Sequence, residues 1–300
     1  MTENDARPEP VLIVGAVTWD VVQGASRLQR VPGGSATFAA RTATALGVQA
    51  HVLILAGDDA NLDAFAGHHL TVARAERTMT LEHRFEDGRR HQRVLAHPGR
   101  TLRPSDLPSH WPPPHTMILG PLVPDDMDVM AFLDLPGPDE TAVIAQGIQR
   151  RISHDGTMHD LDVVSAGLFH AARPNVALCL SAEETDRWPD GSLEVLVRRA
   201  VRVVRTLGAE GAEIRTARGT HHIAPLPAEV VDTTGAGDVF ATALILAMRA
   251  GEDVAGRLAA ACAAACMERR GSAPLPARSE LEARAGITPG ASFVAQGDRS

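Results

Sequence analysis

Short apolar runs alternate with segments of helical periodicity along most of the chain. Apolar runs bounded by polar or glycine residues predict buried strands, and longer segments with apolar residues three and four apart predict helices. Strands are predicted at 11–14, 52–55, 117–119, 142–145, 163–166, 176–179, 201–206 and 213–216, and helices at 36–46, 193–200 and 236–250. Because strands and helices alternate, the fold class predicted is α/β, with a mostly parallel sheet covered on both faces.

Polar or glycine residues follow several of the predicted strands. They are Gly15, Asp58, Gln146, Ser181 and Gly208. Ligands of open parallel sheets bind outside the carboxyl ends of the strands. We therefore expect these residues along one edge of the sheet, beside a binding site.

One region has the alternation of antiparallel strands. Apolar and polar residues alternate from 78 to 96 around Asp87-Gly88, which is a strong hairpin signal. The hairpin fits an edge decoration of the sheet or a lid over a substrate. A second extended piece, 20–31, could pair with it, so we expect a small β lid built from about 18–31 and 76–97.

Composition narrows the class of protein. The chain has 300 residues, of which 44% are apolar, enough for one large domain, expected over 1–283, with a tail at 284–300. A net charge of −8, the absence of tyrosine and 3% aromatic residues argue against a nucleic-acid partner. Three cysteines without CxxC spacing indicate buried thiols. With no apolar stretch long enough for a membrane span or a signal core, we expect no membrane partner and a cytoplasmic location.

The most informative stretch is 229–240, which reads Glu-Val-Val-Asp-Thr-Thr-Gly-Ala-Gly-Asp-Val-Phe. An apolar run ends there in a glycine-bearing turn that opens the predicted helix 236–250. The first turn of a helix has unpaired N–H groups, and Gly235 and Gly237 would let an anion approach the backbone. The carboxylate of Asp238 would repel a bound phosphate, unless it removes a proton from an attacking hydroxyl. This pattern predicts a small-molecule kinase with Asp238 as base. By itself, Asp238 is also compatible with an ordinary first-turn carboxylate.

Two common phosphate motifs are absent from this sequence. The chain has no GxxxxGK[ST] segment, and Phe240 stands where a GxGxxG fingerprint requires its third glycine. Neither a P-loop nor a dinucleotide-binding fold is therefore predicted.

Four segments together resemble one family. Asp-Thr-Thr-Gly-Ala-Gly-Asp at 232–238 looks like the C-terminal signature of the ribokinase-like, PfkB-type carbohydrate kinases. Pro-Gly-Gly-Ser-Ala-Thr-Phe-Ala-Ala at 32–40 is similar to their glycine-pair signature, and 206–211 and 259–271 resemble their nucleotide-side segments. The resemblance spans about residues 10–280. It implies a three-layer α/β sandwich with a small β lid, and ATP-dependent phosphorylation of a hydroxyl.

The resemblance also implies roles for individual residues. Asp238 would be the base, with Gly235, Ala236 and Gly237 as the anion hole. Asp20, Gly33 and Gly34 would hold the substrate, in a pocket that we expect Phe38 and Gln146 to line. Thr206, Gly208 and Gly211, with Gly235 and Gly237, would line the nucleotide. Glu184 would organise Mg²⁺ indirectly, and Asp232 and Thr234 would hold a monovalent cation such as K⁺ beside backbone near Gly271.

The sequence departs from the family at informative positions. Phe38 stands where an asparagine is usual, and Ser181 replaces the asparagine of an Asn-x-x-Glu motif that ends here at Glu184. Phe38 fits packing or stacking on substrate, and Glu184 fits a solvated helix position or the metal role.

The segment Gly-Gly-Ser-Ala-Thr-Phe resembles the inositol-kinase subgroup and favours a sugar or cyclitol as substrate. A nucleoside, with Trp19 and Phe38 flanking its base, and a non-catalytic nucleotide or polyol sensor are the alternatives. A homodimer formed through the lid is a further hypothesis.

Overall fold

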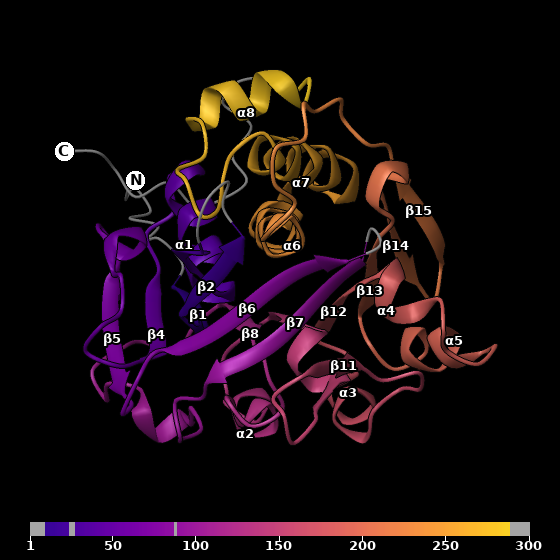
Figure 1. Cartoon of the computed structure of the whole chain (residues 1–300). Helices are drawn as coiled ribbons and strands as arrows, with labels where there is room; N and C mark the ends of the chain where they lie inside the picture. The colour runs from indigo at the N-terminus through magenta and orange to yellow at the C-terminus, as the bar shows by residue number, and fades with distance from the viewer. Residues whose placement is uncertain (1–9, 24–27, 87–88, 289–300) are drawn as a thin grey trace.

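The central element of the computed structural model is a nine-stranded sheet (Figure 1). The structure describes residues 10–23, 28–86 and 89–288. The strand order is β15-β14-β13-β12-β9-β8-β1-β4-β5, parallel except at β13–β14 and β14–β15. The strands are β1 (Val11–Ala16), β4 (His51–Ala56), β5 (His69–Arg74), β8 (Thr116–Gly120), β9 (Glu140–Ile144), β12 (Val176–Ser181), β13 (Arg202–Thr206), β14 (Ala212–Thr216) and β15 (Gly219–Ile223).

Helices cover both faces of this sheet (Figure 1). One face carries α1 (Ser35–Ala45), α6 (Ala236–Ala247), α7 (Glu252–Met267) and α8 (Arg278–Arg284), and the opposite side carries α2 (Val129–Leu133), α3 (Ala166–Ala171), α4 (Ala182–Thr185) and α5 (Ser192–Val197). Short 3₁₀ helices are η1 (Asp63–Phe65), η2 (Pro104–Asp106), η3 (Ala145–Gln149), η4 (Gly208–Glu210) and η5 (Met248–Ala250). This is the predicted α/β sandwich of three layers.

Strand β1 shows why its sequence is an unbroken apolar run. Val11 and Ile13 belong to the core beneath α1, α6 and α7, whereas Leu12 and Val14 belong to the core on the other side. A strand that is buried on both faces has no solvated side on which polar residues could alternate.

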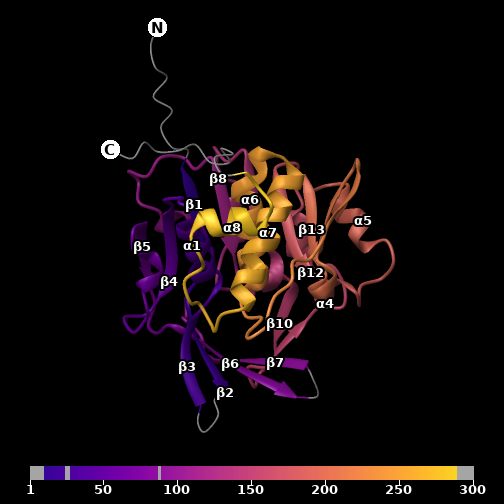
Figure 2. The same cartoon turned by 90° about the horizontal axis from the view of Figure 1, so that it is seen from above.

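A second, four-stranded sheet lies beyond one end of the main sheet (Figure 2). We call it the small sheet. It contains β2 (Thr18–Gln23), β3 (Leu28–Gly33), β6 (Met79–Glu86) and β7 (Arg89–Ala96) in the order β3-β2-β6-β7. Both predicted extended pieces are in it, although the turn residues Asp87 and Gly88 lie outside the described residues. A hairpin of β10 (Arg150–Ile152) and β11 (Met158–Asp160) touches β7, where the Val94 N–H donates to the Gly156 carbonyl.

The strand predicted at 163–166 is wrong. Val163 is exposed, and Ser165 begins helix α3 as its N-cap, where its hydroxyl accepts the Leu168 N–H at 3.0 Å. The hydroxyl of a capping serine supplies a partner that a free helix N–H otherwise lacks. The short apolar run therefore precedes a helix and is not a strand. The helices predicted at 193–200 and 236–250 are present but end earlier, at Val197 and Ala247.

The packed core continues past the predicted domain end at residue 283. Ala285 and Ile287 are buried in the same cluster as α7, while residues 289–300 of the predicted tail lie outside the described part. Among the described residues, no helix has both the length and the apolar character that crossing a membrane requires.

Candidate active site

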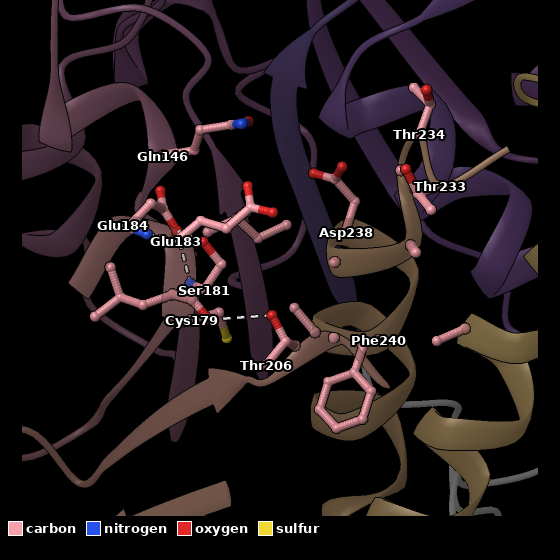
Figure 3. Close-up of a pocket in the computed structure, with 18 of the residues that line it drawn as sticks. Gln146, Cys179, Ser181, Glu183, Glu184, Thr206, Thr233, Thr234, Asp238 and Phe240 are labelled. Carbon is pink, nitrogen blue, oxygen red and sulfur yellow. Dashed lines mark hydrogen bonds between the residues drawn. The ribbon is translucent and has the colours of Figure 1, made fainter. Parts of the chain in front are cut away.

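A pocket of about 1140 Å³ lies at the carboxyl ends of the central strands (Figure 3). Its lining includes Ile144 at the end of β9, Ser181 at the end of β12 and Thr206 at the end of β13. The small sheet, the beginning of α6 and a segment between β15 and α7 contribute further walls. Gln146 and Gly208, two of the residues predicted at this edge, also line the pocket.

The beginning of α6 faces this pocket. Gly235 is the N-cap in the left-handed region, with φ 78°, and Ala236, Gly237 and Asp238 follow in the first turn. All four residues line the pocket, and a Cβ added to Gly237 would meet no atom within 4 Å. The Ala236 N–H donates to the Thr233 carbonyl at 3.3 Å, while the space beside Gly237 leaves room for an anion at this turn. The carboxylate of Asp238 points into the same space, across from Gln146 and Glu183 (Figure 3).

Phe38 supports this turn from α1. The side chain is buried, and its ring lies so close to Gly235 that a Cβ at that position would overlap it. Sequence reasoning placed Phe38 in the substrate pocket. The residue does line that pocket, but the ring is also a packing surface for the backbone of the predicted anion hole.

Asp20 lies at the opposite wall, on strand β2. It is 4% exposed, and its Oδ1 accepts a hydrogen bond from the Thr18 hydroxyl at 2.7 Å. A Cβ on Gly33 would overlap the Asp20 carboxylate, and one on Gly34 would overlap the Ala16 carbonyl. Both glycines are thus required by close backbone approach, and Gly34 also has a φ of 95°.

Two residues near Asp20 were missed by sequence reasoning. His83 is buried, with Nε2 3.4 Å from Asp20 Oδ1, and its Nδ1 lies 3.4 Å from the Gln92 amide nitrogen. Both side chains line the pocket. In the sequence they are only two positions of an alternating hairpin, so no local signal distinguishes them.

Gln146 lies in η3 beside a buried arginine. With its amide oriented so that the oxygen faces donors, that oxygen accepts from the two terminal nitrogens of Arg150 at 2.5 and 3.1 Å. Arg150 in turn pairs with Asp160 at 3.1 Å. The predicted pocket residue is therefore held by a cation that sequence reasoning did not include.

Ser181 and Glu184 form a capping box at the start of α4. Oε2 of Glu184 accepts from the Ser181 N–H at 2.7 Å and from its hydroxyl at 2.8 Å. Burial raises the pKa of the Glu184 carboxyl, and nearby Arg150 opposes that shift. The neighbouring Glu183 is exposed and extends into the pocket (Figure 3). In the described part of the chain, no group of three His, Cys, Asp or Glu residues is arranged to hold a metal.

The third wall is a slot between β15 and α7. It is mostly apolar and is lined by Ile223, Leu226, Ala260, Ala263, Ala264 and Met267. Thr206, Gly208 and Gly211, the predicted nucleotide residues, lie at its side. A Cβ on Gly211 would overlap the Ile223 carbonyl, whereas one on Gly208 would enter open space. The apolar side chains of the slot suit an aromatic base.

Asp232 joins two loops behind the anion turn. Its Oδ1 accepts from the Thr234 N–H and its Oδ2 from the Gly271 N–H, both at 2.9 Å. The three residues predicted around a monovalent cation are therefore brought together. Whether a cation binds there stays a prediction.

Trp19 does not form part of this pocket lining in the described residues. Its ring lies under the Arg30 guanidinium, 4.8 Å from the ring centroid, and its Nε1 donates to the Asp59 carbonyl at 3.1 Å. The tryptophan predicted to flank a nucleoside base is thus engaged on another side of the small sheet.

Comparisons with known proteins agree with this arrangement. The model of the pfkB family carbohydrate kinase matches residues 189–278. No curated protein matches the chain. A solved pyrophosphate-dependent kinase in the ribokinase family, complexed with sulfate, has a TM-score of 0.77 and 19% identity, covering 91% of this chain and 99% of that one.

Two further solved structures are similar over the same extent. A pyrophosphate-dependent kinase in the ribokinase family, complexed with a pyrophosphate analogue and myo-inositol, has a TM-score of 0.71 at 19% identity, covering 91% and 99%. Aminoimidazole riboside kinase from Salmonella enterica, complexed with aminoimidazole riboside and an ATP analogue, has 0.69 at 19% identity, covering 92% and 99%. At these identities the likeness establishes the fold.

The fold is that of solved structures in the ribokinase family, and its pocket places a carboxylate in the predicted anion turn. The matching segment contains that turn, the apolar slot and Asp238. The resemblance to pfkB-type carbohydrate kinases is therefore confirmed, and with it the predicted class of enzyme, a phosphotransferase with a hydroxyl group as acceptor.

Proposed function

We propose that this chain transfers a phosphoryl group from ATP to a hydroxyl of an uncharged sugar or cyclitol. The observation that carries the proposal is the position of Asp238. Its carboxylate stands in the glycine-bearing first turn of α6, in a pocket whose far wall holds the buried carboxylate of Asp20.

The acceptor end of the pocket supports a neutral polyol. Asp20 accepts a hydrogen bond from Thr18, and the side chains of His83 and Gln92 add further polar groups beside it. A sugar or cyclitol hydroxyl is the donor that such a carboxylate would bind. Relatives of this fold have been solved with myo-inositol and with aminoimidazole riboside, so the fold accommodates acceptors of this size.

The donor end supports ATP over pyrophosphate. Pyrophosphate would leave the apolar slot beside α7 unfilled, whereas an adenine ring would bury the side chains of Ala263 and Met267. The choice between ATP and pyrophosphate has to be argued, because some proteins of the same fold are pyrophosphate-dependent kinases.

The reaction would follow from the geometry of the pocket. Asp238 would take the proton of the acceptor hydroxyl, whose oxygen attacks the γ-phosphorus. The bond to the bridging oxygen would break, and ADP would leave. N–H groups of Gly235, Ala236 and Gly237 would stabilise the charge on the transferred group. Mg²⁺ bound with the donor would neutralise phosphate charge, and Glu183 and Glu184 are the nearby carboxylates that could orient its waters.

The nucleoside alternative receives less support. Trp19 is covered by Arg30, and the ring of Phe38 packs on Gly235. A base would have to lie against Leu81, Leu122 or Met158, the aliphatic side chains that line the acceptor end. The sensor alternative requires no base, and the placement of Asp238 in the anion turn argues against it.

The test measures product release with Mg·ATP or Mg·pyrophosphate against cyclitols, pentoses, hexoses, nucleosides and sugar phosphates. We expect ATP-dependent turnover of one neutral polyol class. The nearly isosteric Asp238→Asn should lower kcat by about 10²-fold or more while ATP still binds. ATP and polyol binding without turnover in the unaltered protein would establish the sensor instead. Activity with pyrophosphate alone would refute the donor assignment.

Three further properties belong to the same proposal. K⁺ near Asp232 and Thr234 should raise activity, which replacing K⁺ by a larger organic cation would check. A homodimer through the small sheet should appear as twice the monomer mass in solution scattering. A cytoplasmic location follows from the predicted use of ATP.

A further inference from the structure

Three polar side chains of the small sheet lie in a row at the acceptor wall. Gln92 on β7 lies opposite His83 on β6 in the strand register, and β6 runs parallel to β2, which carries Asp20. The Gln92 amide nitrogen lies 3.4 Å from His83 Nδ1, and His83 Nε2 lies 3.4 Å from Asp20 Oδ1. The second distance is an approach without hydrogen-bond geometry, so among the described residues the buried Nε2 has no hydrogen-bond partner. The side chains of His83 and Asp20 are 5% and 6% exposed.

The contact with Gln92 selects one tautomer of His83. An amide NH₂ group can only donate, so the imidazole Nδ1 that it meets must present a lone pair. In the neutral ring the hydrogen then resides on Nε2, the atom that faces Asp20. Because a hydrogen-bond partner of one imidazole nitrogen determines the state of the other, Gln92 acts on Asp20 through His83.

The two carboxylate oxygens of Asp20 have different neighbours. Thr18 and His83, its partners among the described residues, both face Oδ1. Oδ2 lies over Gly33, where a side chain would overlap it. The Thr18 hydrogen bond and the nearby His83 Nε2 therefore both direct Oδ1 away from the acceptor space, and Oδ2 stays beside the glycine pair.

We propose that His83 and Gln92 are positioning residues that hold Asp20 for a hydroxyl of a neutral polyol. This inference rests on the proposed function. A correctly rotated Asp20 distinguishes a polyol from its deoxy analogue, because the analogue leaves a buried acceptor without a donor. Loss of either positioning residue weakens acceptor binding, while the donor slot and Asp238 lie on other elements.

The kinetic test compares His83→Leu, which removes both ring nitrogens, with His83→Gln, whose amide can still donate towards Asp20. The acceptor is the neutral polyol with the highest turnover in the panel, and its deoxy analogue is measured alongside. We expect His83→Leu to raise the acceptor KM about 10-fold or more, to leave the ATP KM within 2-fold, and to reduce the preference over the deoxy analogue. His83→Gln should recover most of the loss.

Gln92→Leu should shift the acceptor KM in the same direction by a smaller factor. A fall in kcat with both KM values unchanged, or unchanged kinetics in His83→Leu, overturns the proposal. Equal rises in the acceptor and ATP KM values also overturn it, because they indicate a general structural effect.

A second measurement does not depend on activity. Side-chain ¹⁵N spectra of the unliganded protein at pH 8 should show His83 as the Nε2–H tautomer, and Gln92→Leu should change that signal. An Nδ1–H tautomer in the unaltered protein overturns the proposal. If no acceptor is turned over at all, the proposed function fails, and the tautomer still decides whether the row exists.

Discussion

The ring of Phe38 lies directly against the backbone of Gly235, so a residue of α1 shapes the turn that begins α6. Gly235 is at φ 78°, and an added Cβ would overlap three carbons of that ring. The anion turn is thus defined by a contact between two segments that are almost 200 residues apart, which couples the two positions energetically.

That coupling can be measured with a double-mutant cycle. Gly235→Ala should lower the free energy of unfolding by about 2–4 kcal/mol, from left-handed strain and overlap with the ring, and should abolish turnover. Phe38→Ala removes the overlap. In urea denaturation the double variant should therefore be at least about 1 kcal/mol more stable than the sum of the single effects predicts. Additive effects would show that the ring does not constrain the turn.

A substitution at Gly237 should lower activity without lowering the stability of the fold. An added methyl meets no protein atom within 4 Å, and alanine is a better helix residue than glycine. Gly237→Ala should therefore fold with equal or higher stability, whereas its methyl would occupy the space in front of the N–H groups. We expect kcat/KM to fall 10-fold or more.

Gly167→Ala is a matched control for this substitution. Gly167 is also the second residue of a helix, α3, and an added Cβ there makes only ordinary contacts at 3.8 Å. It should gain similar stability with unchanged turnover. Full activity of Gly237→Ala would mean that the turn does not receive the transferred group.

Asp126 should make stability fall as the pH rises. Burial raises the pKa of this carboxyl from 3.8 to about 7, although its Oδ2 accepts the Leu122 and Val123 N–H groups. The folded state then binds more protons than the unfolded state between these values, so the contribution of Asp126 is favourable below pH 4 and is lost by pH 7.

Asp126→Asn keeps an oxygen acceptor and removes the titration. Relative to the unaltered protein, its free energy of unfolding in urea should rise by roughly 1–4 kcal/mol between pH 5 and pH 8. The exposed neighbour Asp125 adds only the smallest contribution to the raised pKa of Asp126, so Asp125→Asn serves as control and should show a much smaller trend. A constant difference across the pH range would contradict the assignment.

His68 should make the free energy of unfolding decrease as the pH falls into the acid range, which is the opposite of the trend expected from Asp126. Its Nδ1 accepts the Ala50 N–H at 3.1 Å, and its Nε2 lies 2.9 Å from the Thr44 hydroxyl. Burial lowers the pKa of the imidazole below 6.5. Neutral His68 is favoured in the folded state, so its contribution is present above pH 6.5 and is lost as the pH falls through the folded pKa.

His68→Asn places a non-titrating oxygen where Nδ1 accepts. Between pH 7 and pH 5 the unaltered protein should lose more stability than this variant, by about 1 kcal/mol. His51, whose pKa burial also lowers, titrates in both proteins and cancels in the comparison. The control is the substitution of an exposed histidine, His222→Asn, which should lose as much stability between pH 7 and pH 5 as the unaltered protein. If His68→Asn also loses as much stability as the unaltered protein over this range, the prediction is refuted.

The sequence by itself determined the elements with strong local signals. Strand β1 was predictable because burial on both faces leaves only apolar residues, and the anion turn because glycine and a helix start are local properties. The segment 163–166 was mistaken because an apolar run before a capping serine is too short to show its period. Strand β5 at the sheet edge was missed because it is only partly buried.

The tertiary structure alone decided which distant residues meet. Phe38 and Gly235 come from different helices, and Asp20, His83 and Gln92 come from three strands of the small sheet. The partners of Asp20 depend on strand register, and the room in front of Gly237 depends on how α6 faces the pocket. Such contacts arise from packing between elements, whereas local sequence encodes only propensity and period.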